Sequence, residues 1–213
     1  MSRGLFITFE GSEGCGKSTH MARLRDYLTA CGYECVCTRE PGGSPLSEKI
    51  RELLLFAKEG NTMNSRTEIL LFEAARSQHV SETILPALEA GKCVLCDRFF
   101  DSTTAYQGAA RCIDADSVSW LNKFATNTLD PDITIILDLP VSEGLKRANK
   151  RDCNKTDRMG SQSSEFYERV RASFLDLAKQ NPHRFTVISA MGTKDETFAK
   201  IKECVDNKLQ KNG

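Results

Sequence analysis

A run of glycines with one lysine and two hydroxyl residues, near the start of the chain, has the composition of a phosphate-binding loop. The run is Gly11-Ser12-Glu13-Gly14-Cys15-Gly16-Lys17-Ser18-Thr19. Glycines let the backbone N–H groups turn toward a bound phosphate, and the lysine can neutralise the β- and γ-phosphates of a nucleotide. The hydroxyl of Ser18 can bind Mg²⁺. We therefore expect this run to hold a nucleoside triphosphate.

The residues on either side of the run supply the strand and the helix that such a loop requires. Residues 5–9 are apolar and rich in β-branched and aromatic types, which predicts a buried strand. After the run, Met21, Leu24 and Leu28 recur on one helical face. The context of strand, glycine loop and helix therefore favours a phosphate site over a chance glycine turn.

A second candidate residue for Mg²⁺ binding lies at the end of another predicted strand, residues 92–97. Asp97 ends this strand, and a carboxylate at the end of a buried strand is suited to supporting Mg²⁺. The alternative is that Asp97 caps the turn that follows. Arg98 comes directly after it and is a candidate for binding a second phosphate.

The positions of strands and helices predict how these residues are held. Apolar runs predict five strands, and helical periodicity predicts seven helices between and after them. Alternation of this kind gives a doubly wound five-stranded parallel α/β sheet of the P-loop NTPase-like class, within one domain over residues 1–213. Pro86 is expected to kink the longest helix. The strands are 5–9, 33–38, 92–97, 132–139 and 184–189, and the helices are 20–28, 45–56, 66–89, 114–125, 141–151, 165–179 and 194–209.

Composition excludes several classes of protein. The chain has 213 residues, with 29 Lys plus Arg and 29 Asp plus Glu, so its formal net charge is zero. A neutral chain lacks the basic excess on which general nucleic-acid or membrane-surface binding depends. The chain has no apolar run near the roughly 20 residues that span a bilayer, and it enters a strand without a signal peptide. We expect a cytoplasmic protein that binds neither nucleic acid nor membrane.

The nine cysteines favour core packing over metal binding. Cys93 and Cys96 have C-x-x-C spacing, but strand alternation predicts that they point to opposite faces. The chain shows neither a second such pair nor the paired histidines that would complete a zinc site. Cys15 differs because it lies at a helix N-terminus, where a thiol can become reactive.

The span from 150 to 164 is polar, dense in charge and poor in core residues, which predicts a mobile flap. A phosphotransferase needs such a flap to exclude water and to bring cations to the transferred group. Arg151 and Arg158 lie in the flap, and Arg147 lies on the helix that enters it. The alternative is an ordinary solvated basic surface.

A GTP-driven switch is the competing class of function. Asn154-Lys155-Thr156-Asp157 matches the N-K-x-D pattern that reads guanine, and Asp157-Arg158-Met159-Gly160 matches D-x-x-G. The context is wrong for both patterns, because no apolar strand precedes the first and the two share Asp157. We therefore favour a small-molecule kinase.

Several further motifs, in order along the chain, resemble the thymidylate kinase family of the bacterial type. The combination covers the chain from near its N-terminus to beyond residue 170. The motifs are Phe9-Glu10-Gly11, Thr38-Arg39-Glu40-Pro41-Gly42-Gly43, Leu71-Phe72-Glu73-Ala74-Ala75-Arg76, Asp97-Arg98, Ala105-Tyr106-Gln107-Gly108 and Phe166-Tyr167-Glu168-Arg169-Val170-Arg171.

The resemblance implies transfer of the γ-phosphoryl group of ATP to dTMP, giving dTDP, with Mg²⁺. It implies that Phe72 stacks on thymine and that Arg76 donates to the thymine O4. Thr103 and Gln107 would read the rest of the base edge. Tyr106 would lie beside the sugar and disfavour a 2′-hydroxyl. The runner-up is another nucleoside monophosphate kinase, acting on dUMP, UMP or CMP, because a methyl group contributes only roughly 1–3 kcal/mol to selectivity.

The resemblance also implies where phosphate and metal bind. Arg98 would clamp the dTMP phosphate, since the planar fork of arginine suits phosphate. Glu13 would face the acceptor nucleotide, and the cis peptide that the family suggests would precede Pro41. The acceptor pocket would also include Arg39, Glu40, Pro41 and Arg51; Ser18 and Asp97 would hold Mg²⁺, and Arg147 would join the loop in binding ATP.

The catalytic arginine and the oligomeric state also follow from the resemblance. Some members of the family carry a catalytic arginine in the phosphate loop and others carry it in the flap. This loop has none, so Arg151 is the candidate, with Arg158 as the alternative because the flap is slightly longer than expected. The family suggests a homodimer that packs through the stretches 66–89 and 114–125.

Overall fold

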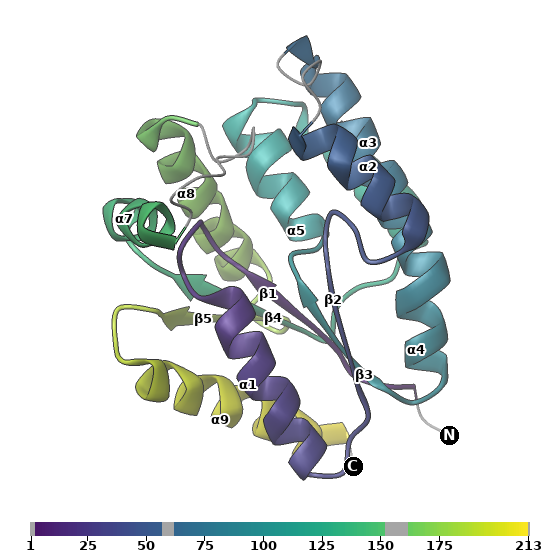
Figure 1. Cartoon of the computed structure of the whole chain (residues 1–213), viewed down its shortest axis with the longest axis vertical. Helices are drawn as coiled ribbons and strands as arrows, with labels where there is room; N and C mark the ends of the chain where they lie inside the picture. The colour runs from purple at the N-terminus through teal and green to yellow at the C-terminus, as the bar shows by residue number, and fades with distance from the viewer. Residues whose placement is uncertain (1–2, 57–61, 152–161, 213) are drawn as a thin grey trace.

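The fold is an open five-stranded sheet, seen in a computed structural model that describes residues 3–56, 62–151 and 162–212 (Figure 1). The sheet order is β2-β3-β1-β4-β5, and all neighbouring strands pair in parallel. The predicted doubly wound α/β sheet is confirmed. The strands are β1 (Phe6–Glu10), β2 (Cys35–Arg39), β3 (Cys93–Asp97), β4 (Ile133–Asp138) and β5 (Phe185–Ser189).

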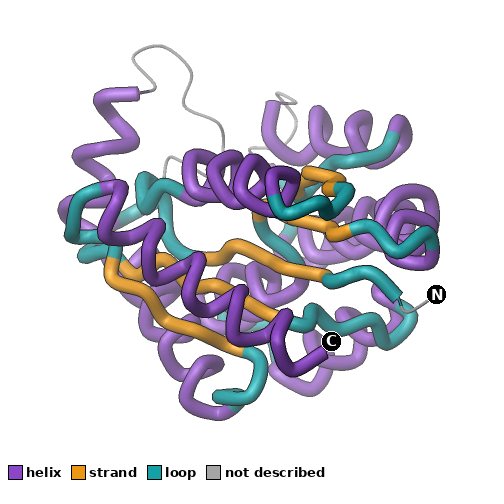
Figure 2. Tube along the Cα trace, turned by 90° about the horizontal axis from the view of Figure 1, so that it is seen from below, coloured by secondary structure: helices purple, strands orange, loops and turns teal. Residues whose placement is uncertain are grey.

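Helices cover both faces of this sheet (Figures 1 and 2). Each predicted helical stretch is helical within the described residues, and the segment after β3 is helical as well, which was not predicted. The segments are α1 (Lys17–Ala30), α2 (Pro45–Phe56), α3 (Ser65–His79), η2 (Val80–Ile84), α4 (Leu85–Glu89), α5 (Phe100–Thr103), η3 (Thr104–Ala110), α6 (Ala115–Thr126), α7 (Val141–Arg151), α8 (Ser164–Gln180) and α9 (Lys194–Asn212).

The hydrophobic core lies in layers on the two faces of the sheet. Ile7 and Phe9 of β1 pack in a cluster with Leu24 of α1 and Ile201 of α9. Phe6 points to the opposite face, where η2, α4 and β3 supply its neighbours. Strand β1 is buried along its whole length, as expected for a central strand with helices on both faces.

Successive side chains of a strand point to opposite faces of the sheet, and this alternation orients the two cysteines of the C-x-x-C pair. Cys93 packs in the cluster with α1 and α9, whereas Cys96 packs in the cluster on the other face. The predicted opposite orientation of the two thiols is therefore confirmed. Both side chains are buried and behave as small apolar residues.

The stretch predicted as one long kinked helix is helical from Ser65 to Glu89 and contains a π-helical insertion. The insertion, η2, ends two residues before Pro86. Proline has no backbone N–H and its ring crowds the preceding turn, so an irregular turn before it is the expected response. Asn64 caps the start of α3 by accepting a hydrogen bond from the Arg66 N–H.

Two helices expose large apolar side chains. Helical periodicity alone would turn Leu46 and Leu53 of α2 inward, yet they are 50% and 45% exposed. On α6, Phe124 is 73% exposed, and Trp120 is 62% exposed and stacks on it with ring centroids 5.2 Å apart. The buried positions of α6 are Val118, Asn122, Ala125 and Thr126, so two of them are polar and the large aromatic residues face outward. No helix in the described ranges is long and apolar enough to cross a membrane.

Candidate active site

A cavity of about 490 Å³ opens at the carboxyl ends of β1, β2 and β3. Parallel strands bring their carboxyl ends to one edge, and the sheet order reverses beside β1, so a crevice is expected there. The cavity brings together most of the residues predicted from the sequence. These are Glu13, Gly14, Gly16, Lys17, Ser18, Thr19, Arg39, Glu40, Pro41, Arg51, Phe72, Arg76, Asp97, Arg98, Thr103, Tyr106 and Gln107.

The glycine run wraps around the side chain of Lys17. The Lys17 Nζ donates to the backbone oxygens of Gly11 at 3.1 Å and Ser12 at 3.0 Å. Gly14 has φ 71°, and a Cβ there would lie 2.2 Å from the Gly144 oxygen, so a side chain does not fit. Helix α1 begins at Lys17, so its first N–H groups and the positive end of its dipole face the cavity. This is the geometry of a phosphate-binding loop.

Ser18 and Asp97 meet across the cavity floor. The Ser18 Oγ donates to Asp97 Oδ2 at 2.7 Å, and Asp97 is the last residue of β3. A hydroxyl and a carboxylate oxygen are the hard ligands that Mg²⁺ prefers, and Mg²⁺ is usually held by one or two protein groups together with phosphate oxygens. The pair therefore fits the predicted metal.

Arg98 lies between the phosphate loop and the opposite wall. Its backbone is in the left-handed region, with φ 71°. Its Nη2 contacts Glu13 Oε1 at 2.6 Å, and its guanidinium lies 5.1 Å from the centre of the Tyr106 ring. Burial raises the pKa of Tyr106 above its ordinary range, so the phenol stays protonated and can donate. Arg98 therefore contacts both Glu13 and Tyr106 at the wall of the cavity.

Glu10 lies beneath Arg98 and received no role in the sequence analysis. Its side chain is fully buried; Oε1 accepts from the Phe99 N–H at 2.7 Å and Oε2 from the Ser102 Oγ at 2.6 Å. The Arg98 Nη1 donates to the same Ser102 Oγ at 3.2 Å. Burial, reinforced by the nearby Asp101 carboxylate, raises the pKa of Glu10 to about 7. A carboxylate at the end of an apolar strand was the signal that could have identified it.

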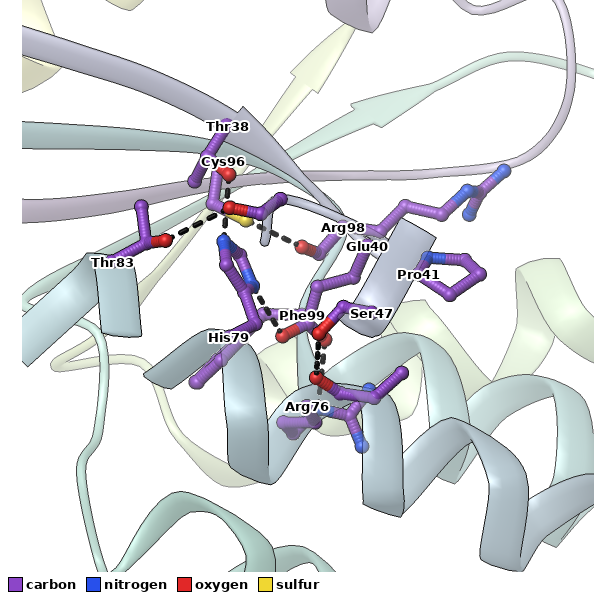
Figure 3. Close-up of polar contacts among 12 residues, drawn as sticks. Thr38, Glu40, Pro41, Ser47, Arg76, His79, Thr83, Cys96, Arg98 and Phe99 are labelled. Atoms are coloured by element: carbon purple, nitrogen blue, oxygen red, sulfur yellow. Dashed lines mark hydrogen bonds and ion pairs between the residues drawn. The ribbon is translucent and has the colours of Figure 1, made fainter. Parts of the chain in front are cut away.

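Arg76 is held in a buried ion-pair network (Figure 3). Its Nε donates to Glu40 Oε2 at 2.8 Å, and its Nη1 contacts Glu73. The His79 ring lies between Glu40 Oε1, at 3.0 Å from Nδ1, and Thr38 Oγ1, at 2.6 Å from Nε2. Burial raises the pKa of the Glu73 carboxyl. Arg76 is 1% exposed and still lines the cavity, so the network fixes a guanidinium at its wall.

Arg39 and Arg51 reach the same cavity from β2 and α2. The Arg51 Nη1 donates to the Pro41 oxygen at 2.7 Å, and the peptide before Pro41 is cis, as the family resemblance suggested. Arg39 is paired with Glu48 at 2.9 Å and is about half exposed. Both arginines therefore line the cavity while paired to groups of the protein.

The remaining predicted residues lie outside the cavity lining. Gly11, Ser12 and Cys15 belong to the loop; Cys15 is 2% exposed, which argues against the hypothesis of a reactive thiol. The Arg147 Nη1 donates to the Ala190 oxygen at 3.2 Å. Arg151 ends α7, but its side chain, Arg158 and most of the predicted flap lie outside the described residues.

Three lining residues were not predicted as part of the site, namely Leu55, Phe99 and Ser102. Phe99 follows Arg98, and its ring packs edge-on against Phe6 with centroids 5.0 Å apart. Ser102 joins Glu10 to Arg98 as described. Ser102 lies four residues after Arg98, and the two side chains meet because the segment between them turns into helix α5. Since this helix was not predicted, the sequence alone did not indicate the contact.

Comparison with known proteins agrees with this geometry. A family model described as thymidylate kinase matches residues 9–201. The thymidylate kinase of Desulfovibrio desulfuricans is 46% identical over 214 residues, covering 98% of each chain. The thymidylate kinase of Geobacter sulfurreducens is 47% identical over 211 residues, covering 97% of this chain and 98% of the relative.

A solved structure gives the same result in three dimensions. The crystal structure of thymidylate kinase from Ehrlichia chaffeensis superposes with a TM-score of 0.78 at 36% identity, covering 95% of this chain and 99% of that chain. The family model itself spans the phosphate loop, the Asp97-Arg98 pair and the wall around Arg76. The chain belongs to the thymidylate kinase family.

Proposed function

We propose that the cavity is where this chain transfers the γ-phosphoryl group of ATP to dTMP, giving dTDP, the reaction predicted from the sequence. The supporting observation is that the phosphate loop and the acceptor residues line one cavity. In-line transfer requires the two nucleotides to meet end to end, and positioning then supplies much of the rate. The two GTP-switch patterns lack the structural context that they need, and no residue that the structure describes favours a UMP or CMP kinase.

The phosphate loop would bind the β- and γ-phosphates of ATP. Lys17 donates to the carbonyls of Gly11 and Ser12, and it would exchange these contacts for phosphate oxygens. Ser18 and Asp97 would hold Mg²⁺. When bound, the metal would neutralise charge on the β- and γ-phosphates. Thr19 and the backbone N–H groups at the start of α1 complete the cradle.

The opposite half of the cavity would bind dTMP. Arg98, with Arg39 and Arg51, would clamp the acceptor phosphate, and Glu13 would hold Arg98 in place. Tyr106 would lie beside the sugar and leave no room for a 2′-hydroxyl. The wall that faces the base would be Phe72, Arg76, Thr103 and Gln107, with Glu40 and Pro41 at its edge.

Arg151 is our candidate for the arginine that neutralises charge in the transition state, with Arg147 on the same helix as a contact for ATP. The phosphate loop carries no arginine, so the cation must come from elsewhere in the chain. Replacing Arg151 by alanine should lower kcat more than it changes KM for dTMP. An unchanged kcat would move the role to Arg158.

We also propose that the protein is a homodimer that packs through α3 and α6. These helices pack against each other and carry the exposed apolar side chains of Leu70, Trp120 and Phe124, which are 55%, 62% and 73% exposed. Large apolar side chains exposed on two neighbouring helices are typical of a protein interface. Large aromatic residues supply much of the binding energy in such interfaces.

A coupled assay of ADP release tests the proposed activity. The purified chain is given ATP, Mg²⁺ and one of dTMP, dUMP, UMP, CMP or AMP, and kcat/KM is compared. We expect dTMP to be the best acceptor, with dUMP next because it lacks only the methyl group. A higher kcat/KM for UMP or CMP would assign the chain to another acceptor.

A further inference from the structure

The side chain of Gln107, on the wall of the base pocket, is oriented by a buried acid. Its Nε2 donates to Glu68 Oε1 at 3.0 Å, and the two side chains are 2% and 1% exposed. An ionised carboxylate can only accept hydrogen bonds, so the NH₂ end of the amide must face Glu68. The carbonyl end of the amide, Gln107 Oε1, then points away from Glu68, and it can only accept a hydrogen bond.

The charge on Glu68 is balanced within the protein. The Arg111 Nε donates to the same Glu68 oxygen at 2.6 Å, and Arg111 follows directly after η3, the segment that carries Gln107. Arginine keeps its charge at any physiological pH, so the buried Glu68 has a permanent cationic partner. The orientation of the Gln107 amide is therefore set by a stable ion pair on its inner side.

The pocket also contains a hydrogen-bond donor with a fixed position. Arg76 can only donate, and Glu40 and Glu73 hold its guanidinium at the cavity wall. The base wall therefore combines a fixed donor, from α3, with a fixed acceptor, from η3. The polar edge of a pyrimidine must match both groups to bind well.

Thymine and uracil match this pattern, and cytosine reverses it. Thymine has the O4 acceptor beside the N3–H donor, whereas cytosine has an NH₂ donor beside the N3 acceptor. Building on the proposed function, we propose that Glu68 is a positioning residue that determines specificity: it turns the Gln107 amide so that the site accepts N3–H pyrimidines and rejects cytosine. Glu68 acts through Gln107 and does not itself touch the base.

The simpler alternative is that Glu68 is only structural and holds α3 against η3. A structural role and an orienting role predict different effects of Glu68→Gln on acceptor selectivity. A structural tie, once weakened, lowers activity on every acceptor by a similar factor. Loss of orientation lets the Gln107 amide turn its NH₂ end toward the base, which harms acceptors that carry N3–H and spares dCMP.

The experiment measures kcat/KM of wild type and Glu68→Gln with dTMP, dUMP and dCMP. We expect activity on dTMP and on dUMP to fall together by about tenfold, the worth of one hydrogen bond of ordinary strength. The ratio of kcat/KM for dTMP to that for dUMP should stay constant, and the ratio of kcat/KM for dTMP to that for dCMP should fall by about tenfold or more. Equal losses on all three acceptors would overturn the proposal.

Exchange of the two side chains provides a rescue. Gln107→Glu alone places two carboxylates face to face and should lower activity on dTMP. In the double variant E68Q/Q107E, the amide donates to the carboxylate, which again offers an acceptor oxygen to the base. The dTMP to dCMP ratio should then return to within about threefold of wild type, since the pair has the same partners. A ratio that stays low would overturn the proposal, even if Glu68→Gln alone fails to fold.

Arg111→Lys is the matched control, because it keeps the charge beside Glu68 and leaves the Glu68–Gln107 bond in place. It should leave the dTMP to dCMP ratio unchanged, and a changed ratio would assign selectivity to the ion pair instead. The activity of the wild-type protein separates failure of the proposed function from failure of the proposed role of Glu68. If wild type makes no dTDP, the proposed function fails, whereas an active wild type with unaltered selectivity in the variants defeats only the role of Glu68.

Discussion

Replacing Glu10 by glutamine should change how the stability of the protein depends on pH. Glu10 is fully buried, and its pKa rises from 4.5 to about 7 because burial, together with Asp101, disfavours the charged form. Glutamine has the same shape; its oxygen can accept from the Phe99 N–H, and its NH₂ can donate to Ser102. The variant therefore keeps the two hydrogen bonds and removes the titration.

The direction in which stability changes with pH follows from how the folded and unfolded chains bind the proton of Glu10. Between pH 4.5 and 7 the unfolded chain has already lost the proton of Glu10, whereas the folded chain keeps it. The stability that the neutral carboxyl contributes is therefore complete below pH 4.5 and is lost as the pH rises through 7. One pKa unit corresponds to about 1.4 kcal/mol, so wild type should lose about 3 kcal/mol relative to Glu10→Gln between pH 4.5 and 8.

Urea unfolding at a series of pH values measures this difference. Free energies of unfolding are extrapolated for both proteins at each pH, and the gap between them is plotted. Glu203→Gln, at an exposed carboxylate, is the control for loss of one negative charge. The reasoning is refuted if the gap between wild type and Glu10→Gln is the same at pH 5 and pH 8.

Three further predictions concern the site and the surface. Lys17→Ala should lower kcat by at least about a hundredfold in the steady-state assay, because the transferred group loses its fixed cation; a loss below tenfold would remove Lys17 from the mechanism. Asp97→Asn should raise the Mg²⁺ concentration needed for half-maximal rate, and an unchanged requirement would mean that Asp97 only caps its turn. Trp120→Glu should convert a dimer to a monomer in analytical ultracentrifugation, since a charge cannot be buried in an apolar interface; identical sedimentation of variant and wild type would place the interface elsewhere.

Local signals were sufficient to predict the frame and to single out residues that the structure places in one cavity, such as Lys17 and Asp97. Strand β1 and the loop after it carry their information in consecutive residues, so apolar composition and glycine spacing identified Lys17 and its cradle. Asp97 was predicted in the same way, from an apolar run that ends in a carboxylate. These features depend on neighbours along the chain.

Features that depend on distant residues were harder to predict. The contacts of Glu10 and Glu68 are with the turn after β3, with α5 and with η3, which lie 39 to 92 positions away. Residues 100–110 fold as α5 and η3, and only that helical winding brings Gln107 to Glu68. The outward position of Trp120 could not be predicted, because periodicity alone does not distinguish a helix face that packs internally from one that stays exposed.

The proposed transfer requires one cavity to hold both nucleotides end to end. The direct test is the affinity of a single molecule in which adenosine and thymidine are joined through their 5′ carbons by a chain of phosphates, measured by calorimetry beside ATP and dTMP. If both halves of the cavity are used at once, this molecule should bind at least about a hundredfold more tightly than either nucleotide, because the entropy of association is lost only once. An affinity no greater than that of the tighter single nucleotide would contradict the shared cavity.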